Sequence, residues 1–326
     1  MLKDQHHRNI NYLRLSVTDK CNLRCFYCMP EEGIPFWKKS KVLSWEEMLR
    51  VCHLLTSNGV DKVRITGGEP FVRKDLMFFL SELATLPNAP EISLTTNATL
   101  ITPYIDQLKS LGIKHINVSL DTLDKDRFLK ITRRDDFETV YQNLNLLIAE
   151  GFNVKVNCVV MEGKNIEDLI PLAELSRSKN LSVRFLEEMP FNAQGGTPDL
   201  TWNYIKILNY LVNHFGEINK LKDPANATSL NYKVKGFTGS IGIIPSFSRT
   251  FCGSCNRMRL SANGDFRTCL YGSPAANLRD LLRSNISDQG LLKNIKQALA
   301  NKPLDGYEAD ALSNEDIKDS MAYLGG

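Results

Sequence analysis

The sequence lacks any long hydrophobic run and carries little net charge. None of its apolar segments reaches the roughly 20 residues that a membrane-spanning helix needs. The first ten residues, MLKDQHHRNI, are polar and contain no apolar signal-peptide core, so we expect a cytoplasmic location and no membrane partner. The formal net charge is only +3, so binding to nucleic acid is not expected either.

Histidine is also scarce, with five residues in 326, and no internal repeat or low-complexity segment is evident. The chain has eight cysteines, of which six form two sets of three with no histidine close by in sequence. In a reducing compartment such cysteines indicate metal binding or catalysis more than disulfides. Cys52 and Cys158 lie in apolar surroundings and are expected in the core.

Short β-rich runs alternate with amphipathic helical patterns in the first 190 residues. Strands are expected at 12–17, 62–66, 91–96, 115–120, 154–160 and 181–187. Helices are expected at 44–57, which begins with a Ser44-x-x-Glu47 capping box, from an N-cap at Thr102, and at 137–150 and 166–179. This alternation predicts an α/β fold, a partial (β/α)₆ TIM-like barrel over 1–190 with a C-terminal extension over 191–326.

Cys21, Cys25 and Cys28 form the first set, in the run CNLRCFYCMP directly after the first expected strand. A [4Fe–4S] cluster has four irons, so three thiolates leave one iron without a protein ligand, open for chemistry. The spacing resembles that of the radical S-adenosylmethionine (SAM) enzymes, in which SAM chelates the open iron. A structural zinc site is the alternative, and it needs a fourth ligand that the surrounding segment does not offer.

The run Gly67-Gly68-Glu69-Pro70 follows the second expected strand. Glycine lets the backbone approach a ligand closely, although the run alone is equally compatible with a tight turn. Beside the cysteine set it resembles the glycine motif that holds the amino group of SAM. Because the carboxyl ends of parallel barrel strands form the active face, these motifs are expected to meet there.

Cys252, Cys255 and Cys269 form the second set, with Arg257-Met258-Arg259 between them. A second [4Fe–4S] cluster with one open iron is the favoured interpretation, and three quarters of a zinc knuckle is the alternative. The arginines match phosphate geometry, although a solvated basic hairpin has the same composition. Further charged residues on expected barrel strands, which are costly there unless they face a ligand, are Arg14, Arg64 and Lys155.

Together these motifs resemble the GTP 3′,8-cyclases of molybdenum cofactor biosynthesis over nearly the whole chain. The matching segments are RLSVTDKCNLRCFYCMP, RITGGEP, LTTN, VSLD, VKVN, FCGSCNRMRLSANGDFRTCLY and the final Gly-Gly. The resemblance implies cluster ligands at the six cysteines and SAM contacts at Tyr27, Gly68, Ser119 and Met189. It implies GTP contacts at Arg14, Arg64, Thr95, Lys155, Arg257, Met258 and Arg259, and catalytic roles for Arg257, Arg259, Gly325 and Gly326.

The resemblance also implies a reaction and its partners. A 5′-deoxyadenosyl radical from SAM removes hydrogen from C3′ of GTP, and C3′ then bonds to C8 to give (8S)-3′,8-cyclo-7,8-dihydro-GTP, which makes the enzyme a lyase. The cofactors are two [4Fe–4S] clusters and SAM. Implied partners are GTP, an external electron donor and a downstream cyclic pyranopterin monophosphate synthase that receives the product, with the chain a monomer or homodimer.

Two other functions remain open from the sequence. One is a radical SAM enzyme with an auxiliary cluster that modifies a peptide, although such domains usually carry more than the three cysteines found after residue 200. The other is a zinc- or cluster-binding regulator without catalysis. The sequence alone does not decide the role of Gly325 and Gly326 either, since glycines at a chain terminus are usually frayed.

Overall fold

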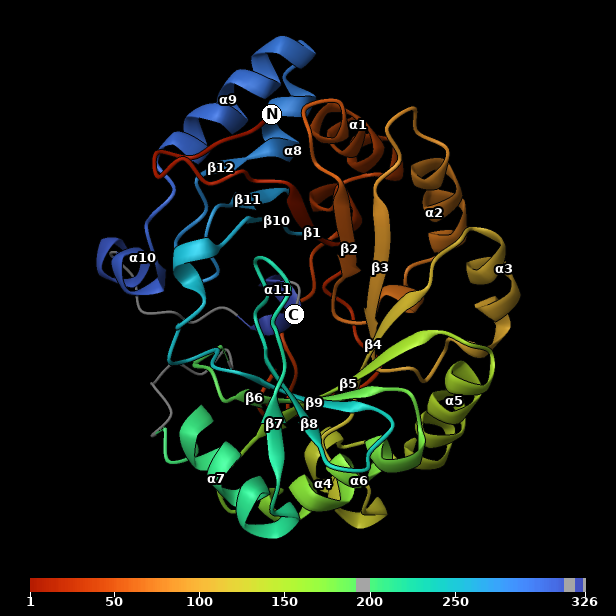
Figure 1. The fold of residues 1–326 in the computed structure, drawn as a ribbon. Helices are drawn as coiled ribbons and strands as arrows, with labels where there is room; N and C mark the ends of the chain where they lie inside the picture. The colour runs from red at the N-terminus through yellow and green to blue at the C-terminus, as the bar shows by residue number, and fades with distance from the viewer. Residues whose placement is uncertain (192–199, 314–319, 325–326) are drawn as a thin grey trace.

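A single sheet forms the frame of the molecule. Within residues 1–191, 200–313 and 320–324, which the computed structural model describes, this sheet contains twelve strands in the order β12-β11-β10-β1-β2-β3-β4-β5-β6-β9-β8-β7. The eight central strands run parallel, as the alternation of strands and helices predicts. They curve into an incomplete ring with helices around the outside (Figure 1).

The first six parallel strands lie close to their expected positions. They are β1 (Tyr12–Ser16), β2 (Lys62–Thr66), β3 (Glu91–Thr96), β4 (His115–Ser119), β5 (Asn153–Val160) and β6 (Ser182–Glu187). Each pairs with the next strand along the chain. The prediction of a partial six-unit barrel is therefore confirmed.

The helices lie mostly between these strands. They are α1 (Trp45–Thr56), α2 (Leu76–Ala84), α3 (Ile105–Ser110), α4 (Lys125–Thr132), α5 (Phe137–Ala149), α6 (Leu169–Ser178), α7 (Tyr204–Phe215), α8 (Leu278–Arg283), α9 (Asp288–Ala300), α10 (Gly306–Leu312) and α11 (Met321–Leu324). Ser44 caps α1 with the expected capping box. The predicted N-cap at Thr102 is wrong: Thr102 is the first residue of a short 3₁₀ turn ahead of α3, and its hydroxyl bonds to Asn143 and caps no helix. The helices α2 and α4 were not predicted.

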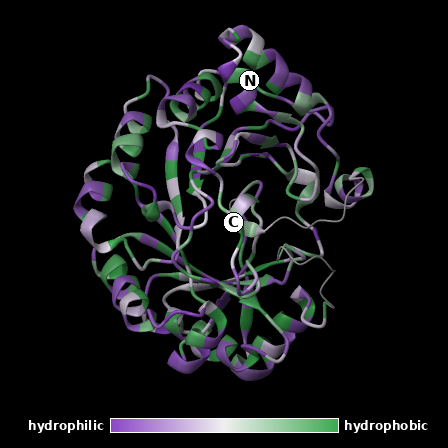
Figure 2. Cartoon of the chain, turned by 180° about the vertical axis from the view of Figure 1, so that it is seen from behind, coloured by the Kyte–Doolittle hydropathy of each residue, from purple (hydrophilic) through white to green (hydrophobic). Residues whose placement is uncertain are grey.

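Most of the parallel strands have one apolar and one polar face. Leu13, Val63, Leu94, Val156 and Phe185 are fully buried in the main hydrophobic core. The alternate positions of β1 to β6 carry mostly charged, amide or hydroxyl side chains, and Figure 2 shows the resulting mixture of hydrophobic and hydrophilic residues along the strands. The polar face is the one that carries the predicted arginines, so it is the face where a ligand is expected.

The C-terminal half of the chain extends the sheet at both edges. β10 (Arg257–Leu260) pairs parallel with β1, and β9 (Ser240–Ile244) pairs parallel with β6. The outer strands are antiparallel: β11 (Asp265–Arg267), β12 (Ala276–Asn277), β8 (Leu230–Val234) and β7 (Ile218–Lys220). Helix α11 lies at the centre of the ring (Figure 1). The division at residue 190 stays a prediction, since the two halves share one sheet.

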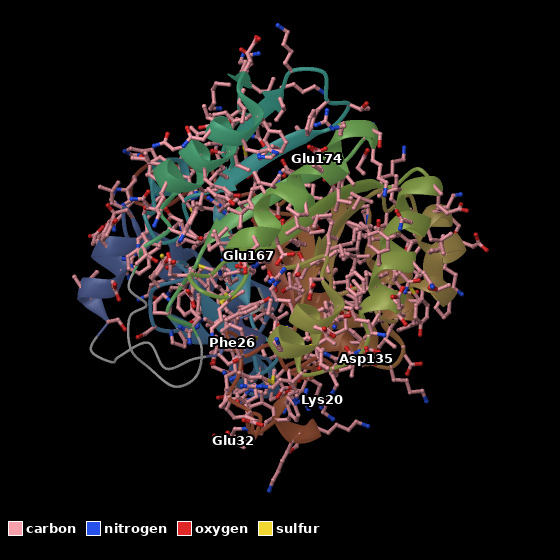
Figure 3. The ribbon with its side chains drawn as sticks, turned by 90° about the horizontal axis from the view of Figure 1, so that it is seen from below. Lys20, Phe26, Glu32, Asp135, Glu167 and Glu174 are labelled. Carbon is pink, nitrogen blue, oxygen red and sulfur yellow. The ribbon has the colours of Figure 1, made fainter. Side chains whose placement is uncertain are left out.

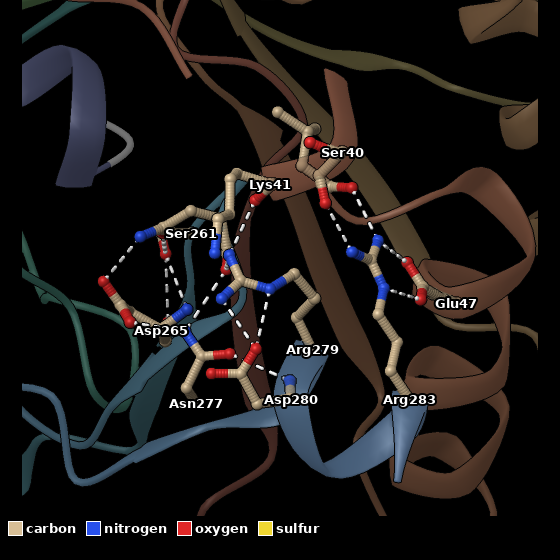
Figure 4. A network of polar contacts seen from close by, with 11 residues as sticks. Ser40, Lys41, Glu47, Ser261, Asp265, Asn277, Arg279, Asp280 and Arg283 are labelled. Atoms are coloured by element: carbon tan, nitrogen blue, oxygen red, sulfur yellow. Dashed lines mark hydrogen bonds and ion pairs between the residues drawn. The ribbon is translucent and has the colours of Figure 1, made fainter. Parts of the chain in front are cut away.

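Two arginines of α8 tie the C-terminal half to the N-terminal half. Arg279 donates to the backbone carbonyls of Lys41 and Asn263 at 2.8 and 2.9 Å. Arg283 binds the carboxylate of Glu47 in α1 at 2.7 and 3.0 Å (Figure 4). These contacts fix the edge of the sheet that carries β10, and with it the second cysteine set.

Candidate active site

The first cysteine set lies in the loop that follows β1. Cys21, Cys25 and Cys28 are half-buried free thiols that line one cavity of about 190 Å³. Burial, together with the nearby Glu69 carboxylate, raises the pKa of the Cys21 thiol to about 12. Burial also raises the pKa of Cys28, against hydrogen bonds from Ser320 and the Ala322 amide. Binding a metal centre therefore has to displace protons from these sulfurs.

The helix α4 supports this loop. The amides of Arg24 and Phe26 donate to the carbonyls of Thr132 and Ile131 at 2.9 and 3.1 Å. Arg133, at the end of α4, donates to the carbonyls of Arg24 and Met29. Figure 3 labels Lys20 and Phe26 of the loop and Asp135 just after α4 on the same side of the molecule. Arg133 was not among the predicted residues, because its sequence context is that of an ordinary charged loop.

The glycine run packs directly against the cysteine loop. The amide of Gly68 donates to the carbonyl of Thr18 at 2.7 Å, and that of Glu69 to Lys20 at 2.8 Å. A Cβ atom on Gly68 would lie 2.4 Å from the carbonyl oxygen of Lys20. Only glycine fits this close approach of two backbones. The run is thus more than a turn, since it joins the ends of β1 and β2.

The cavity collects the residues predicted to contact SAM. Its lining includes Tyr27, Gly68, Ser119 and Met189, together with Thr95, which was predicted to contact GTP. The Tyr27 hydroxyl donates to Asp121 Oδ2 at 2.8 Å. Burial raises the pKa of Asp121 to about 6, against hydrogen bonds from Val159 and Tyr27. The roles of these five residues stay predictions, but the fold brings them to one place.

A row of cations crosses the polar face of the sheet. Arg14 on β1 is in register with Arg64 on β2 and Arg259 on β10, and Lys155 and Arg184 follow on β5 and β6. Residues paired in register point to the same face. Arg184 was not predicted, although it has the same signal, a charge on an expected barrel strand. We call the six cations Arg14, Arg64, Lys155, Arg184, Arg257 and Arg259 the basic row.

The basic row is electrostatically unbalanced. Burial and neighbouring cations lower the pKa of Lys155 to about 8, of Arg184 to about 10 and of Arg259 to about 9. Some buried nitrogens have no hydrogen-bond partner, namely Arg14 Nε, Arg64 Nη1, Arg184 Nε and Arg257 Nη2. Buried charge without a counter-ion is costly. The basic row therefore favours the binding of an anion that has several oxygen atoms.

Met258 does not share this arrangement. It lies between Arg257 and Arg259 on β10, so its side chain points to the opposite face. The side chain is fully buried in the main hydrophobic core. The GTP contact of Met258 stays a prediction, and from this position the backbone of Met258 is the part that would make it.

The second cysteine set lies at the other end of the strands. Cys255 comes two residues before Arg257, which pairs with Tyr12 at the start of β1, whereas Cys21 follows the end of β1. Five residues of strand span roughly 13 Å between first and last Cα. The basic row therefore lies between the two cysteine sets along the direction of the strands.

Basic groups also hold the second set. Arg8 donates to the carbonyl of Cys252 at 3.1 Å, and the buried Lys302 ammonium donates to the carbonyls of Arg257 and Thr268. Burial raises the pKa of the Cys255 thiol, but Arg257 and Lys302 outweigh it and bring the pKa to about 6. The site thus favours a thiolate at Cys255.

Neither cysteine set has the geometry of a single-ion site. Zinc needs four ligands around one point, with sulfurs about 2.3 Å from the metal. Among residues 1–191, 200–313 and 320–324, no three His, Cys, Asp or Glu side chains form such a group. The three cysteines of the first set line one cavity of about 190 Å³, and such a space suits the larger [4Fe–4S] cube. Gly325 and Gly326, predicted as catalytic, lie outside the described residues.

Family models match both halves of the chain. Residues 15–176 match the Radical SAM superfamily, and residues 181–307 match Molybdenum Cofactor Synthesis C. Among solved structures, SuiB of Streptococcus suis is similar, with a TM-score of 0.60 at 16% identity, covering 91% of this chain and 67% of that chain. Such low identity shows the fold alone.

Curated relatives are more similar in sequence. The GTP 3′,8-cyclase of Petrotoga mobilis is 38% identical over 99% of this chain and 99% of its own length. The mitochondrial GTP 3′,8-cyclase of Arabidopsis thaliana is 39% identical over 93% of this chain and 78% of its length. Molybdenum cofactor biosynthesis protein 1 of Homo sapiens is 40% identical over 92% of this chain and 48% of its length. The chain spans about half the length of several animal relatives of that kind.

The partial barrel, the cysteine loop and the glycine run define a radical SAM protein. Two findings place the chain in one family of that class. Its second half matches the model of Molybdenum Cofactor Synthesis C, and a GTP 3′,8-cyclase is similar to it over the full length of both chains. The chain belongs to the GTP 3′,8-cyclase family of molybdenum cofactor biosynthesis. No helix within the described residues is long and apolar enough to cross a membrane.

Proposed function

We propose that this chain is a radical SAM lyase that converts GTP to (8S)-3′,8-cyclo-7,8-dihydro-GTP. The observation that carries the proposal is the basic row between two cysteine sets, in which several buried guanidinium nitrogens have no hydrogen-bond partner. A triphosphate supplies many oxygens to such forked donors. The family membership makes GTP the triphosphate to test first.

The first cavity holds SAM in this proposal. Cys21, Cys25 and Cys28 would be the ligands of one [4Fe–4S] cluster, which would supply the electron that breaks the S–C5′ bond of SAM into methionine and a 5′-deoxyadenosyl radical. The hydrogen from C3′ of GTP leaves as part of 5′-deoxyadenosine, and the C3′–C8 bond forms. One further electron and one proton complete the dihydro product, so an external donor supplies both electrons.

The protein contributes position and charge. Gly68 and its neighbours bring the backbone of the glycine run against the cysteine loop, where carbonyls can face the SAM ammonium. The basic row offsets the triphosphate charge and holds the ribose toward the first cavity. Cys252, Cys255 and Cys269 are proposed to hold a second cluster, which would offer an open iron to the guanine base. Met321 and Ala322 line the first cavity and reduce its contact with water.

The remaining partners belong to the same proposal. All eight cysteines are free, as a reducing compartment such as the cytoplasm requires. The product passes to a cyclic pyranopterin monophosphate synthase, and the chain acts as a monomer or homodimer without nucleic acid. Gly325 and Gly326, which lie outside the described residues, are proposed to take part in catalysis. No observation favours the peptide-modifying alternative, since a row of cations suits a polyphosphate.

The test is anaerobic incubation of the iron- and sulfide-loaded chain with SAM, a reductant and GTP. Expected results are about eight irons per chain without zinc, 5′-deoxyadenosine production that GTP stimulates, and the 3′,8-cyclised product. Arg184→Met should lower GTP affinity by at least tenfold and leave the iron content unchanged. Arg177→Met, on the exposed side of α6, is the matched control. Stimulation by peptides and not by GTP would refute the proposal.

A further inference from the structure

The segment from Ser320 to Leu324 contacts the surroundings of both cysteine sets. Ala322 packs with Met29 and Ile34 beside Cys28, and the Tyr323 hydroxyl donates to the carbonyl of Pro35 at 2.7 Å. On its other side, Leu324 packs with Tyr271, two residues after Cys269. The segment is therefore a strap across the space between the two sets.

Ser320 is the residue of this strap that lies at a metal ligand. Its side chain is fully buried, and its hydroxyl donates to the carbonyl of Cys28 at 2.6 Å. The same oxygen lies 3.9 Å from Cys28 Sγ. The amide of Ala322 donates to that oxygen at 3.1 Å, which polarises the hydroxyl. A hydroxyl hydrogen rotates, so it can point to the carbonyl or to the sulfur.

Whether Cys28 is a thiol or a thiolate decides which acceptor the Ser320 hydroxyl donates to. As a thiol, the sulfur is a weak acceptor, and the carbonyl takes the hydrogen. As a cluster thiolate, the sulfur carries negative charge and competes for it. Hydrogen bonds to cluster sulfurs stabilise the more negative, reduced state and so raise the reduction potential.

We propose that Ser320 is a positioning residue that donates to the ligand sulfur of Cys28 and raises the reduction potential of the first cluster. The proposal rests on the first cluster of the proposed function. The effect belongs to the Ser320 hydroxyl itself, which lies 3.9 Å from Cys28 Sγ. Loss of another contact of the strap that leaves this hydroxyl in place is therefore expected to leave the reduction potential of the first cluster unchanged.

The experiment measures the reduction potential of the first cluster in the full chain, loaded anaerobically with iron and sulfide. Electron paramagnetic resonance follows a redox titration, and added SAM identifies the first cluster by the change in its signal. Ser320→Ala is expected to shift the midpoint to a more negative value. Ser320→Thr keeps the hydroxyl and is expected to retain the parent midpoint.

Two controls separate the hydrogen bond from general loosening. Ser284→Ala removes an exposed hydroxyl just after α8, outside the strap, and should leave the midpoint potential of the first cluster unchanged. Tyr323→Phe removes the bond to Pro35 from the same strap but leaves Ser320 in place. The proposal is overturned if Ser320→Ala keeps the parent midpoint, or if Tyr323→Phe shifts it equally. A parent chain without any [4Fe–4S] signal overturns the proposed function instead.

Discussion

Gly68 lies where two backbone segments meet, so a single methyl group there has large consequences. In Gly68→Ala the new Cβ would lie 2.4 Å from the Lys20 oxygen and 2.6 Å from its carbonyl carbon. Backbone atoms cannot rotate away, so the cysteine loop has to shift. We expect a loss of about 1–3 kcal/mol in the free energy of unfolding. SAM affinity should fall with it, measured by calorimetry.

The matched control for this substitution is Gly272→Ala. It adds the same methyl group where the nearest atoms, in Ala309 and Cys269, lie at 3.8 Å. This is ordinary van der Waals contact, so stability and SAM affinity should both stay near the parent values. Equal effects of the two substitutions would contradict the steric account of Gly68.

The pKa values of Lys155 and Tyr12 predict how anion binding depends on pH. Burial and nearby cations lower the pKa of Lys155 to about 8, so its positive charge is lost above that pH. Burial opposes ionisation of Tyr12, but Arg64 and Arg14 outweigh it and lower the pKa of Tyr12 to about 8 as well. Above pH 8 the site thus loses a cation and gains an anion. GTP affinity should fall as pH rises through this range.

Calorimetric titration with GTP between about pH 7 and 9 tests this, since both groups change charge in that window. Lys155→Arg keeps its charge there, and Tyr12→Phe cannot ionise. Each variant is expected to show a shallower fall in affinity than the parent chain. A fall of unchanged steepness in both variants would show that other groups cause it.

At the scale of elements, Glu69 joins the ends of β2 and β3. Its carboxylate is fully buried and accepts hydrogen bonds from the Thr96 hydroxyl at 2.8 Å and the Asn97 amide at 2.7 Å. Burial raises the pKa of Glu69 to about 7, against these hydrogen bonds. The carboxylate therefore holds the glycine run to the strand that carries Thr95.

Glu69→Gln is expected to loosen this junction, because an amide has one acceptor oxygen where the carboxylate uses two. One backbone or hydroxyl donor is then left facing an NH₂ group, and this lowers the free energy of unfolding by about 1–3 kcal/mol. Urea denaturation measures the loss. Glu91→Gln, at an exposed pair with Lys62, is the control and should cost about 0–1 kcal/mol. Similar losses would contradict a special role for Glu69.

Elements with a strong local pattern could be predicted from the sequence. The strands at 62–66 and 91–96 and the capping box at Ser44 depend on neighbours in sequence, and the structure has them where expected. The N-cap at Thr102 could not be judged, because its hydroxyl binds Asn143, 41 residues away. Helix α4 is short and polar, so its contact with the cysteine loop was equally hidden.

The residues of the candidate site also differ in whether a local sequence motif marks them. Cys21 and Gly68 carry local motifs, and the fold places both at one cavity. Arg133 and Ser320 act on the cysteine loop through backbone carbonyls, which any residue supplies. Such contacts leave no motif in the sequence. The basic row was partly predictable, since a charge on a barrel strand is itself a signal.

At the scale of the whole molecule, the C-terminal half closes both edges of the barrel sheet. β10 covers the edge of β1, and β9 covers the edge of β6. Without them, each edge would present unpaired backbone groups, a known route to aggregation. Met258 and Ile243, both fully buried in the main hydrophobic core, would be lost as well. The two halves are therefore interdependent in folding, whatever their separate roles in binding.

A chain cut to residues 1–190 is expected to aggregate or to unfold without a cooperative transition. Its β1 and β6 edges and the core beneath them would face water. A chain cut to residues 1–313 keeps β9 and β10 and is the control, expected to remain monodisperse with one cooperative thermal transition. Light scattering after gel filtration and calorimetry measure both. If residues 1–190 fold cooperatively alone, the barrel is an independent domain, and the edge strands only extend a sheet that is already stable.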